Sequence, residues 1–423
     1  MPHSRAHKLT IKFALIAMAI SAGMLTHAAQ LPHTFKLKSI APENHQFDDL
    51  APVGRAVGNA QLVVLGEQTH GEGDVYSLKV RLVEYLHEVK GFNVLVMESG
   101  LFDGTSIGKM STDGKDLLDN APDNIFFVYS KTVQARPIFS YLDGQRKAGT
   151  PMAFASFDSQ HSGKLSQSHL VDQLGEFLTR SGSVLPQSDE WRNFKELSQP
   201  LFAFNRTAPP AAAQDSYFHL VDQAFICLGT NDKPELVEQS AYWRRVVASL
   251  RSQATRFWKT GSDSMADLNL REEASADNLL WLMRQVYPGK KMIIWTHDVH
   301  GQKAALYPGI KGAMQRVREQ MPESRFYHAY FTAYSGDYTD YLTGATVHIG
   351  EHGPHSLEST LHGAGYNYGF VDLLAKGTPL RHRLLDGNDR TFPTNRVELG
   401  DFADGVFYID TMHPTVREKG FEN

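Results

Sequence analysis

The sequence predicts an α/β protein with a central, largely parallel sheet, flanking helices and a helical insertion. Three observations support this fold class. Apolar runs of strand length recur along the chain and are bounded by turn-forming residues. The first two runs enclose a helical pattern, and such a β-α-β unit has parallel strands and a right-handed crossover. The stretch from about 165 to 285 contains successive helical patterns and no strand of comparable strength.

The first β-α-β unit begins with Gln61–Leu65, an apolar run that predicts a buried strand. Apolar residues then recur at steps of three and four, which predicts a helix over about 73–90 that ends at Gly91. Phe92–Met97 is a second apolar run and predicts the second strand. The helical apolar positions are Val75, Leu78, Leu82, Leu86 and Val89.

The remaining elements complete one predicted domain over residues 30–423. We expect the insertion at about 165–285 to form a wall or lid over the strand ends. Five further runs predict strands at Pro151–Phe157, Lys291–Thr296, Phe326–Thr332, Gly369–Leu374 and Gly405–Asp410. Five helical patterns fill the insertion at His169–Leu178, Glu190–Phe204, Tyr217–Cys227, Leu236–Trp258 and Leu268–Gln285.

Residues 1–29 have the pattern of an export signal. A positively charged start precedes the apolar stretch Phe13–Leu25, and small residues then permit cleavage after Ala28 or Ala29. The apolar stretch is short, because a membrane-spanning helix needs about 20 residues. We therefore expect a periplasmic or secreted protein with no membrane span after signal cleavage. An uncleaved membrane anchor is the alternative.

Composition limits the expected partners and the possible sites. The 423 residues carry a formal net charge of -5 without a long basic run, so nothing favours a nucleic-acid partner. The single cysteine, Cys227, excludes an internal disulfide and any multi-cysteine metal site. Its apolar sequence neighbours predict a buried structural thiol.

Acids and histidines follow four of the predicted strands. In open parallel sheets, ligands bind beyond the carboxyl ends of the strands, so residues at these ends meet at one edge. Gly66, Gly71 and Gly73 surround the first strand end and permit tight turns and close backbone approach. The residues that follow the strands are Glu67, His70, Glu98, Asp158, His297 and His300.

His70 is the candidate catalytic base, because imidazole is the side chain suited to proton transfer near neutral pH. Glu67 or Glu98 would fix its tautomer and stabilise the imidazolium. His297 and His300 lie three residues apart, a spacing that suits either a metal pair or a pair that stabilises an oxyanion. The alternatives are histidines with only structural or surface roles.

We expect five residues to contact the substrate. Asp158 and His300 lie at strand ends. Arg271 shares one face of a predicted helix with Ser275 and Asn278, from which it either reaches the site or has a structural role. Lys79 lies beside the apolar face of the first helix, where it either reaches solvent or pairs with the carboxylates. Asp74 either caps that helix or contributes to the site.

The chain shows no evident nucleophile elbow of the kind that serine acyl-enzymes use. Zincin, P-loop and dinucleotide-binding motifs are also missing from the sequence. Serine esterases, zincins, nucleoside triphosphatases and nicotinamide enzymes are therefore unsupported. Acids and histidines without an evident covalent nucleophile indicate activation of water, by a histidine base or by a metal.

Several motifs, taken in this order, resemble the erythromycin esterase family. Leu65–Gly71 (L-G-E-Q-T-H-G) is similar to the family's G-E-x-T-H-G motif after the first strand, and the second strand ends in Glu98. Trp295–His300 (W-T-H-D-V-H) is similar to its late W-x-H-x-x-H element. Arg271–Asn278 resembles its R-D-x-x-M-A-x-N helix. These matches extend from about 60 to 300, and weaker similarity continues beyond.

The resemblance implies an α/β core with helical additions and an esterase that opens macrolide lactones with an activated water. It implies His70 as the base, Glu67 and Glu98 as its acidic surroundings, and His297 as a further site residue. His300 matches the family's second late histidine. The substrate would then be a small molecule.

The chain also departs from the family pattern. Lys79 stands where the family commonly has an arginine. A lysine lacks the guanidinium group, which can donate two parallel hydrogen bonds to a carboxylate or carbonyl. Asp74 stands where the family has a glutamate. The predicted export signal is unlike a cytoplasmic resistance esterase. These departures leave hydrolysis as the expected reaction but bear on whether the substrate is a macrolide, because members of one family can act on different ligands.

We therefore expect a hydrolase that cleaves an ester or lactone and needs no cofactor. One alternative keeps the hydrolysis but uses a divalent metal held by His70, His297, a glutamate and His300. The other alternative is a non-catalytic periplasmic binding or envelope protein.

Overall fold

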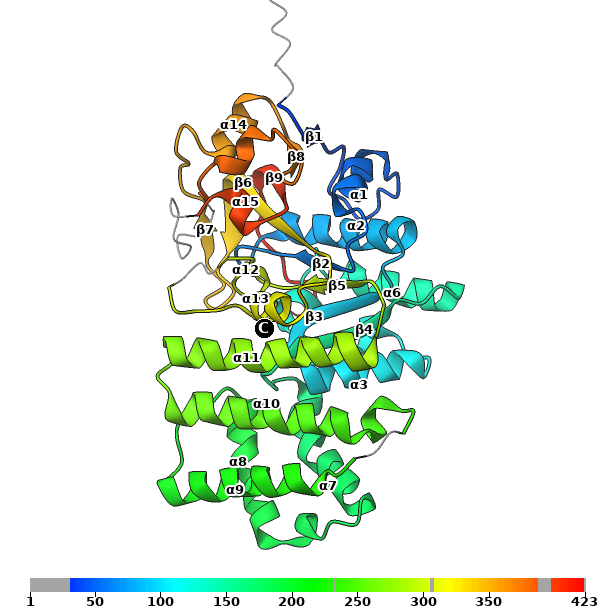
Figure 1. Ribbon diagram of the computed structural model, residues 1–423, viewed down its shortest axis with the longest axis vertical. Helices are drawn as coiled ribbons and strands as arrows, with labels where there is room; N and C mark the ends of the chain where they lie inside the picture. The colour runs from blue at the N-terminus through cyan, green and yellow to red at the C-terminus, as the bar shows by residue number, and fades with distance from the viewer. Residues whose placement is uncertain (1–30, 231–232, 305–307, 387–396, 422–423) are drawn as a thin grey trace, which may run out of the picture. The chain divides into compact units, whose positions relative to one another are not determined.

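The computed structural model describes residues 31–230, 233–304, 308–386 and 397–421 (Figure 1). The predicted export signal at 1–29 lies outside these residues, so export and cleavage stay predictions. Pro32–Asn423 forms one compact unit. None of the helices in the described residues is both long enough and apolar enough to cross a membrane.

A nine-stranded sheet lies at the centre of this unit. Its strands are β1 (Thr34–Lys36), β2 (Leu62–Leu65), β3 (Val94–Gly100), β4 (Ala153–Asp158), β5 (Met292–Trp295), β6 (Phe326–Thr339), β7 (Thr346–His348), β8 (Tyr368–Asp372) and β9 (Gly405–Met412). The order is β1-β8-β9-β6-β2-β5-β3-β4, and β7 pairs with β6 (Figure 1). Strands β9, β6, β2, β5, β3 and β4 run parallel, whereas β1, β7 and β8 pair antiparallel. The predicted α/β class with a largely parallel sheet is confirmed.

The carboxyl ends of the central strands lie level with one another. Leu65 of β2 and Met97 of β3 both lie opposite Trp295 of β5. Glu98 and Thr296 are the next residues along their two segments. Polar side chains from three segments therefore meet at one edge of the sheet.

The strand limits differ from the predicted ones. β3 begins at Val94, later than predicted, and continues through Glu98 to Gly100. β5 lies between β2 and β3, so the strands of the predicted β-α-β unit are parallel without being neighbours. β6 extends to Thr339, well beyond the apolar run that predicted it. The edge strands β1 and β7 were not predicted, because three residues give no periodic signal.

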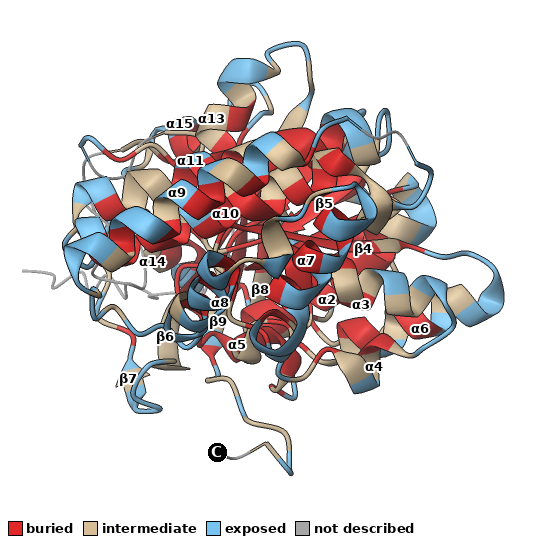
Figure 2. Cartoon of the chain, turned by 90° about the horizontal axis from the view of Figure 1, so that it is seen from below, coloured by how far each residue is buried: buried red, intermediate tan, exposed pale blue. Residues whose placement is uncertain are grey.

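Helices cover both faces of the sheet. Their bounds are α1 (Ala51–Val57), α2 (Gly73–Lys90), α3 (Leu101–Thr112), α4 (Leu117–Asn120), α5 (Phe127–Ser130), α6 (Pro137–Ala148), α7 (Val171–Arg180), α8 (Asp189–Phe202), α9 (Ala211–Cys227), α10 (Ser240–Lys259), α11 (Met265–Trp281), α12 (Asp298–Gly301), α13 (Ala313–Gln320), α14 (Leu357–Gly363) and α15 (Leu399–Phe402). Leu95 and Ile293 pack with α1, α2 and α6, whereas Val96 and Ile294 pack with α7 to α11. Successive strand residues point to opposite faces, so strands covered on both faces are continuous apolar runs. Figure 2 shows the resulting pattern of buried inner and exposed outer helix faces.

The helices between β4 and β5 are stacked in layers (Figure 1). α11 packs against β4 and α13, α10 packs against α11, and α9 packs against α10. This arrangement places α11 beside the strand ends and the other helices behind it. Cys227, at the end of α9, is half-buried rather than buried as predicted, because this last turn also exposes Ile226.

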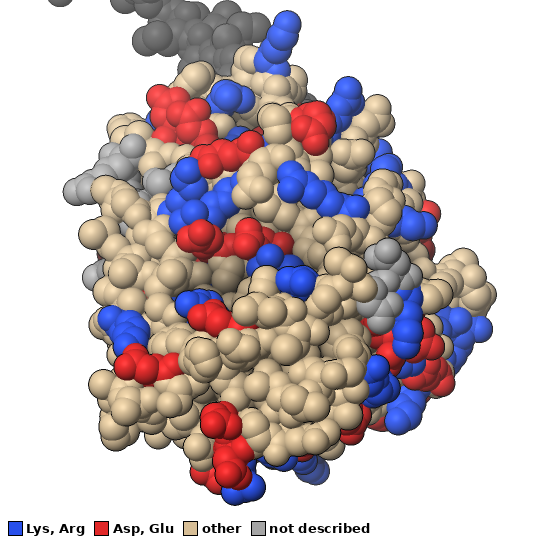
Figure 3. All heavy atoms as spheres, turned by 60° about the horizontal axis from the view of Figure 1, so that its bottom comes forward, with Lys and Arg blue, Asp and Glu red and all other residues tan. Residues whose placement is uncertain are grey.

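Charged residues of both signs are interspersed among uncharged ones on the face shown in Figure 3. The described residues form no broad basic surface on that face. The expectation that the protein has no nucleic-acid partner stays a prediction.

Candidate active site

A tightly packed loop leads from β2 into α2. A Cβ atom added to Gly66 would lie 1.9 Å from Oδ1 of Asp298. One added to Gly71 would lie 1.7 Å from the carbonyl oxygen of Thr339. Any larger residue would displace these neighbours, so both glycines permit a close approach of the backbone. The loop is thereby held against the segments after β5 and at the end of β6.

Glu67 in this loop orients His70. Oε1 of Glu67 lies 2.8 Å from Nδ1 of His70 and accepts a hydrogen bond from the Tyr129 hydroxyl at 2.8 Å. Lys79 of α2 contacts the other carboxylate oxygen. Burial alone raises the pKa of Glu67, but Lys79 and then His70 outweigh it and lower that pKa. Since an ionised carboxylate only accepts, Nδ1 of His70 carries a proton, and in that tautomer of the imidazole Nε2 is an acceptor.

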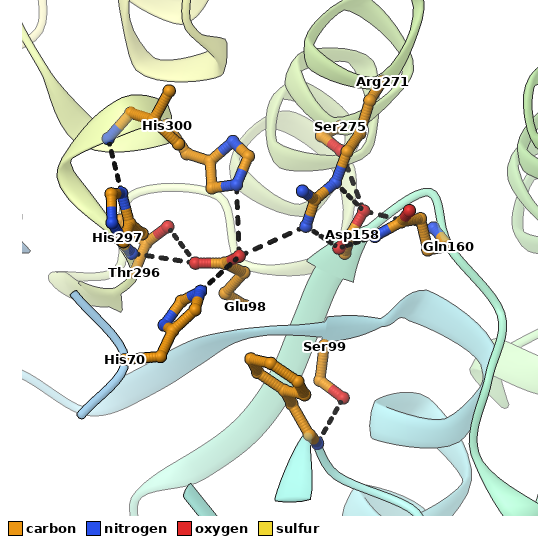
Figure 4. Close-up of polar contacts among 12 residues, drawn as sticks. His70, Glu98, Ser99, Asp158, Gln160, Arg271, Ser275, Thr296, His297 and His300 are labelled. Carbon is orange, nitrogen blue, oxygen red and sulfur yellow. Dashed lines mark hydrogen bonds and ion pairs between the residues drawn. The ribbon is translucent and has the colours of Figure 1, made fainter. Parts of the chain in front are cut away.

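Glu98 lies at the centre of the cluster (Figure 4). Its Oε2 accepts hydrogen bonds from the Thr296 hydroxyl at 3.0 Å and from the backbone N–H of His297 at 2.8 Å. Its Oε1 lies 3.1 Å from Nε2 of His300 and 3.9 Å from Nε2 of His70. The register between β3 and β4 shifts around Glu98, and such a bulge redirects the side chain toward the site.

Arg271 of α11 bridges two carboxylates (Figure 4). Its Nη2 lies 2.6 Å from Oδ2 of Asp158 and 3.2 Å from Oε1 of Glu98, and its Nε lies 3.3 Å from Oδ1 of Asp158. Burial alone raises the pKa of Asp158, but Arg271 outweighs it and lowers that pKa. Burial likewise opposes ionisation of Glu98, yet His300 and other nearby cations hold its pKa well below the usual value. Both carboxylates are therefore ionised.

His300 is held as a cation between two carboxylates. Its Nδ1 lies 2.5 Å from Oε1 of Glu272, and its Nε2 faces Glu98. The other oxygen of Glu272 accepts the backbone N–H of Ala313 at 2.7 Å. Burial opposes protonation, but Glu272 and Glu98 raise the pKa of His300 to about 10. Both ring nitrogens then donate, so His300 supplies positive charge rather than a base.

His297 has the opposite charge state. Its Nδ1 accepts the backbone N–H of Val299 at 3.0 Å, which caps the short helix α12. Burial, and then the neighbouring His70, lower the pKa of His297 to about 3. The ring is therefore neutral with its proton on Nε2. Its centroid lies 5.0 Å from that of His70, so a hydrogen-bond donor stands next to the candidate base.

Aromatic rings surround the imidazole of His70. The ring centroids of Tyr341, Phe126 and Tyr129 lie 4.9, 5.1 and 6.0 Å from it, all nearly edge-on. Phe126 and Tyr341 are only half-buried, so part of each ring faces outward. These rings form an apolar wall beside the polar cluster.

The structure brings most of the predicted site residues together. Lys79 is fully buried against Glu67, so it pairs with a carboxylate and has no exposed surface for a substrate. Asp74 lies outside the cluster, because its carboxylate accepts the backbone N–H of His413 at 2.9 Å and contacts the ring of that residue at 2.7 Å. Asp74 lies in the first turn of α2 but, within the described residues, accepts no backbone N–H of that helix, so it pairs with His413 rather than capping α2 or joining the site. The residues that lie around Glu98 are Glu67, His70, Asp158, Arg271, His297 and His300.

Two residues of the cluster were not predicted. Tyr129 lies on the four-residue helix α5, which is too short to give a periodic signal. Glu272 directly follows Arg271, but its importance depends on α11 lying beside α12, which the sequence does not show. A buried carboxylate next to a predicted site arginine is the signal that would have indicated it.

Gly104–Gly108 spells G-x-S-x-G, a match that the sequence-based exclusion of a serine nucleophile overlooked. In a nucleophile elbow, the serine lies on a sharp turn between a strand and a helix. Here the five residues lie inside α3, and the hydroxyl of Ser106 donates to the carbonyl oxygen of Phe102 at 2.8 Å. The segment is therefore an ordinary helical turn.

A group of side chains spaced closely enough to bind a metal ion lies outside the cluster around Glu98. Within the described residues, the three side chains whose ligand atoms all lie within 4.8 Å of one another are His352, Glu358 and Asp386. Around Glu98, both nitrogens of His300 face carboxylates, and Nδ1 of His297 accepts a backbone N–H. A metal held by these histidines stays a prediction.

Comparison with known proteins places the chain in a family. Residues 87–412 match the family model for erythromycin esterase, and this chain belongs to the erythromycin esterase family. The resemblance seen in the sequence motifs is thereby confirmed. The matched residues include Glu98 and His297 but begin after the loop that carries Glu67 and His70.

Two relatives support a hydrolase function. YbfO of Bacillus subtilis (strain 168), named as a proposed hydrolase, is 24% identical over 408 residues, and the alignment covers 87% of each chain. Erythromycin esterase type II of Escherichia coli is 21% identical over 323 residues, covering 69% of this chain and 73% of the relative. Together with the family, these relatives indicate that the protein is a hydrolase.

Solved structures share the fold. A Bacillus cereus protein superposes with a TM-score of 0.74 at 20% identity, covering 92% of this chain and 97% of the other. A mutant of the erythromycin esterase EreC in its open conformation has a TM-score of 0.66 at 16% identity, covering 90% and 97%. At these identities the likeness concerns the fold alone.

Proposed function

We propose that this protein hydrolyses an ester or lactone bond of a small molecule with a water molecule activated by His70. The observation that carries this proposal is the pair of adjacent imidazoles. His70 has its Nδ1–H directed at Glu67, which leaves Nε2 to accept a proton. His297, whose ring centroid is 5.0 Å away, is neutral and carries its proton on Nε2. A base and an electrophilic donor thus lie side by side.

The attacking water would lie between His70 and Glu98. Nε2 of His70 and Oε1 of Glu98 are 3.9 Å apart, which is too long for a direct hydrogen bond. One water can contact both atoms across such a gap. His70 takes a proton from this water as its oxygen attacks the carbonyl carbon. Glu67 stabilises the resulting imidazolium, as the carboxylate of a catalytic triad does.

The remaining groups act on the intermediate. The Nε2–H of His297 donates to the oxyanion as the carbonyl oxygen gains charge. The carbon–oxygen bond then breaks, and the His70 imidazolium returns its proton to the leaving alkoxide, which gives an acid and an alcohol. Arg271 and His300 keep Glu98 ionised and offset its charge, so the site can accept a developing negative charge.

The apolar wall suggests a substrate with apolar surface. Phe126 and Tyr341 lie beside His70 and are partly open. A small molecule with an apolar body would pack against these rings while its ester group contacts the histidines. The family includes erythromycin esterases, so macrolide lactones belong in the substrate panel with simple esters.

We also propose that the protein is exported, so that it meets its substrate in the periplasm or outside the cell. The charged start, apolar stretch and small residues at 1–29 support this location. Expression of the full chain in a Gram-negative host, followed by fractionation and mass determination of the amino terminus, tests it. A cytoplasmic protein with an intact start would contradict export.

The enzymatic test compares the wild type with His70→Asn on a panel of lactones and simple esters. Lactone opening is detected as a mass gain of one water, and ester cleavage as release of the acid and the alcohol. We expect His70→Asn to lose about 10²–10⁴-fold in kcat/KM. His348→Asn is the matched control, because His348 is exposed and pairs with Asp337 away from the cluster. Each assay is repeated after chelation. Wild-type turnover in His70→Asn would refute the mechanism, and loss of activity on chelation would favour a metal.

A further inference from the structure

A second polar cluster lies beside β6, away from Glu98. It contains His352 from the segment after β7, Glu358 from the first turn of α14, and Asp386. The hydroxyl of Thr332 on β6 donates to Oε1 of Glu358 at 2.7 Å. The backbone N–H of Gly353 donates to Oδ2 of Asp386 at 3.1 Å. The 352–358 segment and the more distant Asp386 thus bring three polar side chains together beside β6.

The ligand-type atoms of this cluster are close together but are not hydrogen-bonded to one another. Nδ1 of His352 lies 3.7 Å from Oδ2 of Asp386 and 3.9 Å from Oε2 of Glu358. The side chains of His352 and Glu358 are each only 2% exposed, whereas that of Asp386 is 22% exposed. The ring of His352 stacks on Tyr334, with the centroids 6.0 Å apart. The imidazole is therefore packed in place.

Two of these buried side chains have unused polar atoms. Oε2 of Glu358 and Nδ1 of His352 have no hydrogen-bond partner of normal geometry among the described residues. Leaving a buried carboxylate oxygen without a partner is costly. Native proteins pair such atoms with protein groups, water or an ion. Nδ1 of His352 lies within 3.9 Å of an oxygen of each carboxylate, so an ion between these three atoms would be within reach of all of them.

We propose that His352, Glu358 and Asp386 form a binding site for a divalent transition-metal ion, separate from the hydrolytic site. The imidazole favours Zn²⁺ and similar first-row ions over Mg²⁺ and Ca²⁺, which prefer oxygen ligands only. With metal–ligand bonds of about 2.0–2.2 Å, two ligands in a tetrahedral site lie roughly 3.4 Å apart. The observed separations are slightly wider, so the bound ion would draw the three side chains together by less than about an ångström each.

The bound ion would join the three segments to the sheet. Thr332 already orients Glu358, as an outer hydrogen bond orients a metal ligand. The competing explanation for this cluster is a simple ion triad, in which a protonated His352 forms ion pairs with both carboxylates. The two differ in one measurable property, because an ion triad binds no metal.

The test titrates Zn²⁺ into the chelator-treated full chain by calorimetry and counts bound metal by mass spectrometry. We expect one Zn²⁺ per wild-type chain at this site, and at least a tenfold weaker affinity in Glu358→Gln and in Asp386→Asn. Asp337→Asn is the matched control, because it removes an exposed carboxylate that also pairs with a histidine, His348. Glu98→Gln controls for zinc bound at the hydrolytic site. Both controls should retain the wild-type affinity.

Two results would overturn the proposal. One is a wild type that binds no Zn²⁺, and the other is a Glu358→Gln or Asp386→Asn chain that binds it as tightly as the wild type. If the buried Glu358→Gln variant fails to fold, the more exposed Asp386→Asn variant carries the test. The readout is metal content rather than ester hydrolysis, so the result is independent of the proposed reaction.

Discussion

Glu67 and Lys79 form a buried ion pair behind His70, and neutralising one partner should destabilise the protein more than neutralising both. Both side chains are 0% exposed, and the ammonium of Lys79 also lies 4.5 Å from the ring centroid of Trp295. Removing one member leaves the other as an uncompensated buried charge, which costs about 3–5 kcal/mol. Replacing both by neutral groups avoids that cost and loses mainly the packing and hydrogen bonds.

The experiment is a double-mutant cycle of Glu67→Gln and Lys79→Met, measured by urea unfolding at neutral pH. We expect each single variant to lose about 3–5 kcal/mol and the double variant to lose less than either single variant, and therefore far less than their sum. Lys311 and Glu319 provide a control cycle, because their pair at 2.8 Å is largely exposed and screened by solvent. Losses that add within about 0.5 kcal/mol would refute the buried-pair argument.

Two further predictions concern stability. The folded pKa of His300, about 10, lies above its ordinary value of 6.5, so its stabilisation is fully present below pH 6.5 and is lost as pH rises to about 10. The stability advantage of the wild type over Glu272→Gln should therefore shrink between pH 6 and pH 10 in urea melts, and a constant difference would contradict this. Gly66→Ala should destabilise by about 1–3 kcal/mol because its Cβ would meet Asp298. Gly144→Ala on α6 is the control, since its Cβ meets nothing within 4 Å among the described residues and should be neutral or slightly stabilising. Equal melting temperatures of the two alanine variants would contradict the steric explanation.

The sequence indicated where the cluster lies because strand ends are visible in the hydrophobic pattern. Leu65, Met97 and Trp295 end apolar runs, and parallel strands bring their ends to one edge. The order of the strands in the sheet could not be predicted from the hydrophobic pattern. The position of β5 between β2 and β3 depends on contacts between residues far apart in sequence. Glu98 was predicted to follow its strand but lies within it, at a bulge that no local signal marks.

The direction of side chains on helices was harder to predict than their position in the sequence. Lys79 and Asp74 both lie in the first half of α2, and both were predicted to reach the site. Lys79 points inward to Glu67, whereas Asp74 points to His413, and the difference is set by rotation about the helix axis. Glu272 shows the same limitation, since its role appears only when α11 is packed beside α12.

The two late histidines show how neighbours decide the chemistry of one motif. Their spacing of three residues suggested a pair with a single task, either metal binding or oxyanion stabilisation. A metal pair would need a lone pair on each ring, but His300 donates from both nitrogens to Glu272 and Glu98. His297 instead accepts a backbone N–H and stays neutral beside His70. The same short segment therefore supplies a fixed positive charge and a neutral donor, so one motif gives two histidines of different charge and different chemistry.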